Sequence, residues 1–211
     1  MKKSIRFLAL ALVGLMLTVG YASATTYGFY NNNNTVDAAI GESQLSMDVT
    51  ASGSNALFKF MNSGPAASSI TDIYFQDAVP FLTFQSFSYS NTGIVFTVDA
   101  IPADLPGGEP YLFTADHSYD SDTPPPQNGV NPGEWLEILF DIASGYDFDD
   151  VIAGLDDASL RIGIHVQGFD GGGSESFINE PSNPVPEPGT MMLLGVGFLG
   201  LAIYGKRRKN S

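Results

Sequence analysis

The stretch LRIGIHVQ, residues 160–167, alternates apolar residues with polar residues or glycine over all eight positions. A second stretch, LEILFDI at residues 136–142, carries an apolar residue at every even position and an acid at two of the odd ones. Successive side chains of a strand point to opposite faces, so a period of two is typical of a strand with one buried face. The two stretches therefore predict half-buried strands and set the expected fold class.

Further segments on both sides of these two have the composition of strands. They are rich in aromatic and β-branched residues or alternate in polarity, and glycine, proline or asparagine bounds them. These segments are residues 45–49, 56–61, 70–76, 81–89, 94–98 and 111–114. Many short strands within one domain favour two packed antiparallel sheets. The sequence thus predicts a mostly all-β fold, an antiparallel two-sheet β-sandwich of seven to nine strands.

One short helix interrupts this pattern at residues 147–155, DFDDVIAGL. Asp147 is a suitable N-cap, and acids follow in the first turn, where the helix dipole favours negative charge. Val151, Ile152 and Leu155 have helical spacing. We expect a short crossover helix between the strands at 136–142 and 160–167.

The first 24 residues have the layout of a signal peptide. They open with a basic start formed by Lys2, Lys3 and Arg6. Residues 7–19 then carry no charge, and Ala22 and Ala24 supply the small residues that a signal peptidase requires. We expect a signal peptide at residues 1–24, removed after Ala24, because an apolar stretch this short followed by a cleavage site disfavours a retained anchor.

The C-terminal part of the chain divides into three short segments. Residues 181–188 are rich in proline, residues 189–205 are uncharged, and residues 206–211 begin with the basic cluster Lys206, Arg207, Arg208 and Lys209. The uncharged segment reaches about 25 Å as a helix, close to the shortest that crosses a ~30 Å apolar layer. We therefore expect a linker, a transmembrane helix and a basic cytoplasmic tail, because basic ends stay inside. Residues 25–180 then form one domain outside the membrane.

This tail resembles the PEP-CTERM sorting signal, through Val185-Pro186-Glu187-Pro188, the glycine-rich apolar segment and the terminal basic cluster. The resemblance implies a Gram-negative bacterium with an exosortase, a membrane cysteine enzyme that cuts near the Pro-Glu-Pro motif and passes the product to the surface or exopolysaccharide layer. A plain single-pass anchor would leave that motif without a role. The expected sorting and processing residues are Ala22, Ala24, Pro186, Glu187, Pro188, Lys206, Arg207, Arg208 and Lys209.

The predicted domain is strongly acidic and has no cysteine. Twenty-two acids face only two basic residues, Lys59 and Arg161, which gives a formal net charge of −20. Such a charge repels nucleic acid and anionic lipid, so neither is an expected partner of the domain. The lack of cysteine excludes thiol catalysis and thiolate metal sites, and folding must rest on the apolar core.

His165 invites a comparison with the catalytic triad of hydrolases. It lies on the polar side of the best strand, and Asp170, Ser174 and Glu175 follow within ten positions. No Gly-x-Ser-x-Gly elbow is present, and a triad is recognised by its geometry rather than by proximity in sequence. The favoured interpretation is a strand histidine that bonds a loop carboxylate. The other histidine, His117, is expected in a loop.

Three groups of aspartates are candidates for calcium binding, because calcium takes six to eight oxygen ligands. The candidates are Asp116, Asp120 and Asp122 in one expected loop, and Asp147, Asp149 and Asp150 at the expected helix start; Asp156 and Asp157 follow that helix. None of the groups fits the calcium-loop pattern D-x-[DN]-x-[DN]-G-x5-E. A solvated acidic surface explains them equally well.

Aromatic residues that can stack on sugar rings suggest a carbohydrate-binding module as an alternative. They are Tyr27, Phe29, Tyr30, Tyr74, Phe75, Tyr89, Tyr111, Tyr119 and Trp135. Most lie in expected strands, where packing in the core is the commoner role. Glycoside hydrolysis by paired acids needs a spacing that sequence does not give.

The combined expectation is an exported, non-enzymatic surface or matrix protein, associated with exopolysaccharide or biofilm. Its expected partners are signal peptidase and exosortase as processing enzymes, extracellular polysaccharide, and the inner membrane transiently through the C-terminal helix. No cofactor is expected, with calcium as the one candidate. Two alternatives stay open, namely a calcium-assisted carbohydrate-binding module and a small hydrolase.

Overall fold

A computed structural model describes residues 24–31, 33 and 35–179 of the chain. The predicted signal peptide, apart from Ala24, lies outside the described residues, as do the linker, the transmembrane helix and the basic tail. No helix within the described ranges is both long and apolar enough to cross a bilayer.

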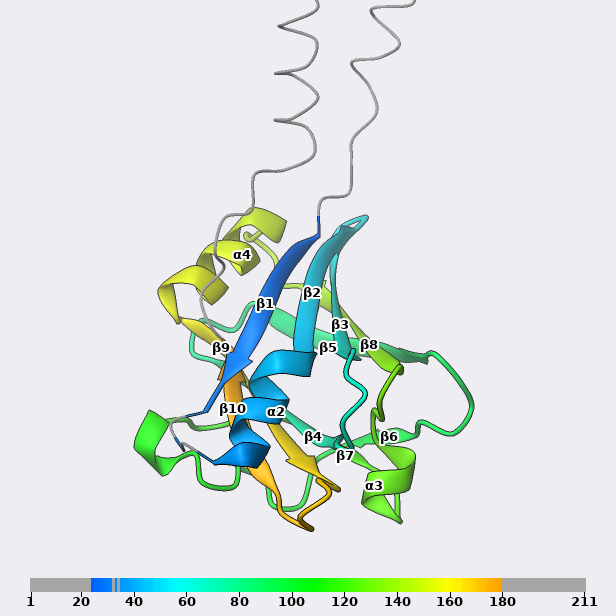
Figure 1. Ribbon diagram of the computed structural model, residues 1–211. Coiled ribbons are helices and arrows are strands. Elements are labelled where there is room, and N and C mark those ends of the chain that lie inside the picture. The colour runs from blue at the N-terminus through cyan, green and yellow to red at the C-terminus, as the bar shows by residue number, and fades with distance from the viewer. Residues whose placement is uncertain (1–23, 32, 34, 180–211) are drawn as a thin grey trace, which may run out of the picture.

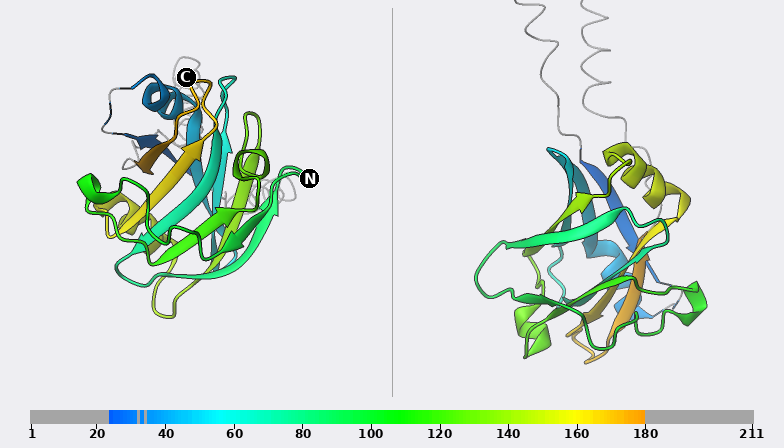
Figure 2. Two further views of the ribbon diagram at one scale, coloured as in Figure 1. Left: turned by 90° about the horizontal axis from the view of Figure 1, so that it is seen from below. Right: turned by 180° about the vertical axis from the view of Figure 1, so that it is seen from behind.

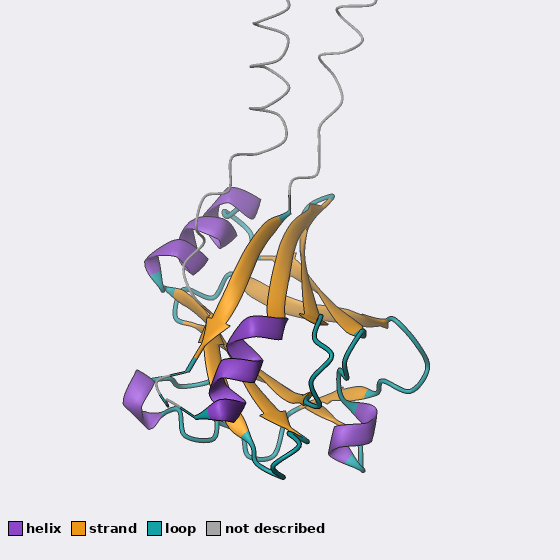
Figure 3. Ribbon diagram, viewed as in Figure 1, coloured by secondary structure: helices purple, strands orange, loops and turns teal. Residues whose placement is uncertain are grey.

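Ten strands and a few short helices make up the described chain (Figure 3). The strands are β1 (Thr25–Tyr30), β2 (Leu45–Ser52), β3 (Asn55–Asn62), β4 (Ser69–Asp77), β5 (Leu82–Tyr89), β6 (Phe96–Val98), β7 (His117–Ser121), β8 (Trp135–Ile142), β9 (Leu160–Gln167) and β10 (Glu175–Asn179). The helices are α2 (Val36–Gln44), α3 (Pro125–Asn128) and α4 (Phe148–Asp157), with a 3-10 turn η1 (Glu109–Tyr111).

All strand pairs are antiparallel and follow the order β5-β8-β3-β2-β1-β10-β9-β4-β7-β6 (Figure 1). β1 joins the two layers, because its first residues pair with β2 and its last two pair with β10. We call the layer of β5, β8, β3 and β2 sheet A, and the layer of β10, β9, β4, β7 and β6 sheet B. The Tyr89 hydroxyl of β5 bonds the backbone of Phe96 in β6 at 3.3 and 3.4 Å, so the two edge strands nearly meet.

Aromatic side chains fill the space between the two sheets. Phe75 of β4 lies at their centre, with its ring centroid 5.2 Å from that of Phe58, 4.9 Å from that of Phe140 and 5.8 Å from that of Tyr119. All four side chains are at most 2 % exposed. Edge-to-face contacts of this kind stabilise a core beyond the area that they bury. The view from below shows the strands curving around the interior of the domain (Figure 2, left).

The predicted antiparallel all-β class is confirmed, and seven of the ten strands coincide with expected segments. The strands number ten within the described ranges rather than seven to nine, because β1, β7 and β10 were not expected while residues 111–114 form no strand. In that segment Leu112 adopts a left-handed φ of 51°, directly after η1. The helix expected at 147–155 is α4, with Asp147 as its N-cap.

A long connection, residues 99–116, covers the outer face of sheet B; we call it the cover loop. Its Leu105 and Phe113 are 4 % and 7 % exposed and pack on Tyr74 of β4, which is fully buried. Gly163 of β9 permits this contact, because a Cβ there would lie 2.8 Å from the Leu105 side chain and 3.2 Å from the Phe113 ring. The outer face of sheet B is therefore a second, smaller core.

The helix α2 was not expected, and it closes one end of the sandwich. Thr35 caps it by accepting a hydrogen bond from the Ala38 backbone at 3.0 Å. Gly41 lies so close to the ring of Phe177 that any side chain would collide with it. At the helix end, the buried Gln44 amide donates to Asn62 at 3.0 Å and to the Ser68 hydroxyl at 2.6 Å.

The two ends of the sandwich differ in what they carry. One end holds the β2–β3 turn at Gly53 and helix α4, and we call it the near end; it is at the top of Figure 1. The other, far end holds α2, α3 and the β9–β10 turn. β1 runs from the near end to the far end, and β10 runs back toward the near end because it is antiparallel to β1. The chain therefore enters the described domain at the near end through β1. The last residue of β10, Asn179, pairs with Phe29 of β1.

Candidate functional site

A pocket of about 370 Å³ lies on the outer side of β9 and β10 toward the far end. Residues from four segments line it. They are Asn31 and Asn33 after β1, Pro106, Gly107, Pro110 and Tyr111 of the cover loop, His165 of β9, and Ser174, Glu175 and Ser176 at the start of β10. We call it the histidine pocket. In Figure 1 the short green coil of η1 and the end of β1 lie beside one another at this place.

The Glu175 carboxylate forms a fixed wall of the histidine pocket. One of its oxygens accepts hydrogen bonds from the side-chain amides of Asn31 and Asn33, both at 3.0 Å. Its other oxygen accepts one from the Thr35 hydroxyl at 2.8 Å. Asn31 also donates to the Ser176 carbonyl at 2.8 Å. Glu175 therefore ties the segment after β1 to strand β10.

His165 contacts the neighbouring strand through one ring nitrogen. It is the direct cross-strand neighbour of Ser176, and its Nδ1 lies 3.0 Å from the Ser176 hydroxyl. Burial lowers the pKa of the His165 ring below its usual value, because the charged form loses its water, although Glu175 acts in the opposite direction. At neutral pH the ring is therefore an uncharged imidazole that can both donate and accept a hydrogen bond.

The residues of the hypothetical triad are only partly brought together. Ser174 and Glu175 line the histidine pocket beside His165, but the hydroxyl that bonds the ring belongs to Ser176. Asp170 lines a different pocket. A triad needs a carboxylate on one ring nitrogen and the nucleophile on the other. In the described contacts Nδ1 faces a hydroxyl, and both Glu175 oxygens accept bonds from Asn31, Asn33 and Thr35.

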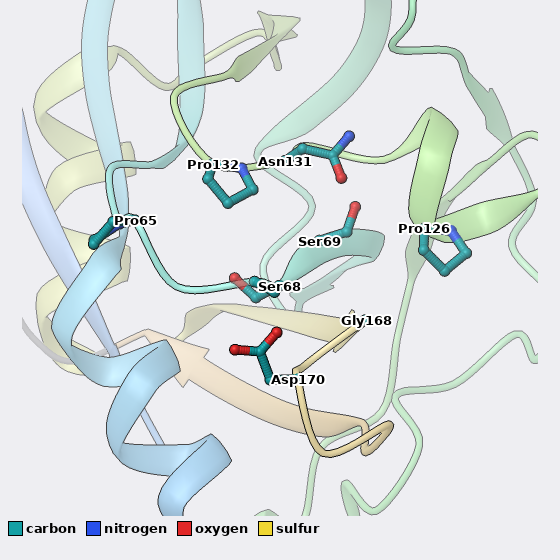
Figure 4. Close-up of a pocket in the computed structure, with 9 residues that line it drawn as sticks. Pro65, Ser68, Ser69, Pro126, Asn131, Pro132, Gly168 and Asp170 are labelled. Atoms are coloured by element: carbon teal, nitrogen blue, oxygen red, sulfur yellow. The ribbon is translucent and has the colours of Figure 1, made fainter.

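A second pocket, of about 390 Å³, opens at the far end between three connections. Three prolines contribute to its wall, Pro65, Pro126 and Pro132, and Figure 4 shows them around the polar groups of Ser68, Ser69, Asn131 and Asp170. We call it the proline pocket. Ser69 is 1 % exposed, and its hydroxyl is the one buried side-chain polar atom in the described ranges that has no hydrogen-bond partner. Water or a ligand in the pocket can supply that partner.

The aspartates considered for calcium are spread over the fold. Among residues 24–31, 33 and 35–179, no three acids or histidines gather as metal ligands do. Asp116 accepts from the Asp77 backbone at 2.8 Å and Asp122 from the Thr123 backbone at 2.8 Å. At α4 the Asp147 side chain accepts from the backbone of Asp149 and Asp150, and the Asp150 side chain accepts from the backbone of Asp147.

These contacts assign the helix-start acids to a capping box. Asp120 and His117 were both expected in loops, and this expectation is wrong. Asp120 lies in β7, and His117 is the first residue of the same strand. His117 Nε2 lies 3.9 Å from a carboxylate oxygen of Asp77. Calcium binding stays a prediction, because the described residues contain no cluster of possible metal ligands that would support it.

A carboxyl pair in sheet B was missed by the sequence analysis. Asp72 of β4 and Asp120 of β7 are cross-strand neighbours under the cover loop and share a hydrogen bond. Asp72 is 4 % exposed and also accepts a bond from the Thr71 hydroxyl at 2.7 Å. Burial, and to a smaller extent the charge of Asp120, raises the pKa of Asp72 to about 6, and burial also raises that of Asp120. The pair therefore holds a proton well above the usual range of a carboxyl.

Of the nine aromatic residues considered for sugar stacking, five are core residues. Tyr27, Phe29, Tyr74, Phe75 and Tyr119 are at most 2 % exposed. Trp135 lies on the outer face of sheet A, with the Lys59 ammonium 4.2 Å from its ring centroid. Tyr111 lines the histidine pocket, and its ring meets that of Tyr30 edge-on at 5.9 Å. Tyr111 is thus the member of this set that a pocket ligand can reach.

Comparison with known proteins gives a match in the C-terminal tail of the chain. A family model of the PEP-CTERM protein-sorting motif matches residues 184–209, which include Pro186-Glu187-Pro188 and the basic cluster up to Lys209. No curated protein and no solved structure matches the chain. The motif implies an exported, membrane-anchored precursor that an exosortase processes and sorts to the cell surface. The chain accordingly carries a PEP-CTERM protein-sorting motif over residues 184–209.

Proposed function

We propose that this chain is a non-enzymatic protein of the exopolysaccharide layer of a Gram-negative bacterium. Signal peptidase releases its N-terminus, the C-terminal helix holds it briefly in the inner membrane, and an exosortase cuts at the Pro-Glu-Pro junction. The single observation that carries the proposal is the sorting motif at residues 184–209.

The contacts of His165 and Glu175 support a role without catalysis. Nδ1 of the imidazole meets a serine hydroxyl, and three neutral donors bond the nearby carboxylate. Neither group is arranged as a base oriented by an acid. The strong negative charge of the domain supports separation from anionic lipid after release.

Intact-mass spectrometry of the protein isolated from its native host tests this proposal. The expected mature form starts at Thr25 and ends between Pro186 and Pro188, and it is recovered with the extracellular polymer. Replacing all three motif residues, by Pro186→Ala, Glu187→Ala and Pro188→Ala together, should leave the basic tail attached and the protein in the membrane fraction.

Pro181→Ala is the matched control, because this proline lies in the same linker but outside the matched segment. It should be processed like the wild type. Recovery of most wild-type copies with Lys206 to Lys209 still attached would contradict the proposal.

A further inference from the structure

We propose that the histidine pocket binds one uncharged sugar unit of a polysaccharide, with the Tyr111 ring as stacking platform and His165, Ser174 and Asn33 as hydrogen-bonding groups. This inference rests on the proposed function, since it names the polymer contact of the same exported domain.

The pocket is formed before any ligand arrives. Its volume of about 370 Å³ falls within the range of small-molecule sites. The three donors on Glu175 fix the wall that joins β10 to the segment after β1. Arg161 fixes the opposite wall, because its guanidinium donates to the Tyr111 carbonyl at 2.8 Å. A wall that is already ordered lowers the entropic cost of binding.

Polar groups in the pocket are free to meet hydroxyls. The Nε2 atom of His165 and the Ser174 hydroxyl make no hydrogen bond with any described residue. An uncharged imidazole and a serine hydroxyl each act as donor or acceptor, and so do the hydroxyls of a sugar. These groups therefore suit a ligand that carries several neighbouring hydroxyls.

The opposite side of the pocket offers an apolar surface. Tyr111 lines the pocket there with Pro106 and Pro110 of the same segment, and its ring meets that of Tyr30 edge-on. A tyrosine ring with its hydroxyl group suits a ligand that has C–H groups on one face and hydroxyl groups around its edge. A pyranose ring has both, whereas a purely apolar ligand would leave the polar side unpaired.

Charge restricts the class of sugar. No lysine or arginine is among the residues that line the pocket, and the Glu175 carboxylate is part of it. The domain around it carries a formal charge of −20. A uronic acid or a sulfated or phosphorylated sugar would meet like charge without a cation to pair with, which selects against it.

The proline pocket is the matched comparison. It has a similar volume and lies at the same end, but no aromatic ring is among its lining residues. The aromatic platform distinguishes the histidine pocket as the sugar site. Ser69→Ala in the proline pocket is therefore a control that leaves the proposed contacts untouched.

A glycan array followed by titration calorimetry tests the inference with the full chain in detergent. The probes are neutral tetrasaccharides of glucose, galactose, mannose and N-acetylglucosamine, and tetragalacturonate as the charged counterpart. The wild type should retain at least one neutral probe and bind tetragalacturonate at least tenfold more weakly. Ser174→Trp, a change at an exposed side chain that fills the pocket, should lower the affinity at least tenfold.

Further variants separate stacking from damage to the fold. Tyr111→Ala should lower the affinity about tenfold or more, whereas Tyr111→Phe keeps the ring and should bind within about threefold of the wild type. Ser88→Trp places the same bulky residue at an exposed serine of β5 and should bind normally, as should Ser69→Ala.

Retention of no neutral probe, equal binding of tetragalacturonate, or unchanged affinity of Ser174→Trp would each overturn the inference. The mass of the mature protein in the host is measured separately. Correct processing without sugar binding would refute the pocket assignment alone, whereas an unprocessed chain would refute the proposed function whatever the array shows.

Discussion

The outer faces of the two sheets differ although their strands alternate in the same way. On sheet A the polar side chains meet solvent, and Lys59 bonds Glu137 at 3.4 Å in a partly exposed pair. On sheet B the corresponding face lies under the cover loop, where Tyr74 is fully buried and Asp72 is 4 % exposed. The face of sheet A is exposed to solvent, whereas that of sheet B is a small core that also buries a carboxyl group.

This difference shows that alternating polarity identifies the polar face of a strand but does not show whether that face is exposed to solvent. A period of two requires only that one side of the strand pack on the core. The other side of sheet B is buried by a segment far along the chain, residues 99–116, which packs on β4, β9 and β10 through Leu105 and Phe113. Buried carboxyls on that side are therefore a product of tertiary structure.

The largest expected effect comes from removing the anchor of the cover loop. Tyr74→Ala deletes a fully buried ring that packs on Leu105 and Phe113, and it also removes the hydroxyl that donates to the Pro102 carbonyl at 3.1 Å. We expect a loss of about 3–5 kcal/mol in the free energy of unfolding. Urea denaturation followed by the fluorescence of Trp135, the one tryptophan of the chain, measures it.

Leu139→Ala on the outer face of sheet A is the matched control. Leu139 is half-buried, so its replacement should cost no more than about 1–2 kcal/mol. Equal losses at the two positions would contradict the proposed difference between the faces.

The buried carboxyl pair should make stability depend on pH. The folded-state pKa of Asp72, about 6, lies above its ordinary value of 3.8, so the folded chain holds this proton more tightly than the unfolded chain. The resulting stabilisation is complete below about pH 4 and is lost as the pH rises through about 6. Its size is at most about 3 kcal/mol.

Asp72→Asn removes this titration. Relative to the wild type, the variant should gain about 1–3 kcal/mol in the free energy of unfolding between pH 4 and pH 7.5. Glu137→Gln, on the open face of sheet A, should show a difference of less than about 1 kcal/mol over the same interval. A constant difference between wild type and Asp72→Asn across this interval would refute the buried pair.

The strand residues that face the core were predictable, and those that depend on a distant partner were not. Strand β7 escaped prediction because Tyr119 is its one large apolar residue, and its pairing with β4 decides its structure. Helix α2 escaped because its buried residues are Ala38, Gly41 and Gln44, which give hardly any apolar periodicity. Both elements are specified by what they pack against.

The candidate site was predictable to a similar degree. His165 and Glu175 were singled out from the sequence, and both line the histidine pocket. The favoured interpretation paired His165 with a loop carboxylate, and Ser174 was considered only as the nucleophile of a triad. The structure instead places Ser176 opposite the histidine in β10, a register that only strand pairing reveals. Asn31 and Asn33 reach the site because β1 ends there, which no local signal indicates.

A smaller effect is expected from a single methyl group under the cover loop. Gly163→Ala places a Cβ 2.8 Å from the end of the Leu105 side chain, which must shift to another position. Overpacking of this kind costs about 1–3 kcal/mol, and a flexible leucine end favours the lower value. Thermal unfolding measures the loss, and Leu105→Ala combined with Gly163→Ala should lose less than the sum of the two single changes.

The smallest effect is expected on the open face of sheet A. Lys59 bonds Glu137 and lies over the Trp135 ring, but both side chains of the ion pair are partly exposed. Such pairs contribute about 0–1 kcal/mol because water screens the charges and two long side chains must be ordered. Lys59→Met should therefore change the free energy of unfolding by less than about 1 kcal/mol, while the emission of Trp135 shifts because its cation is gone. A loss as large as that of Tyr74→Ala would mean that the face of sheet A is covered as sheet B is, and that the contrast between the two faces does not hold.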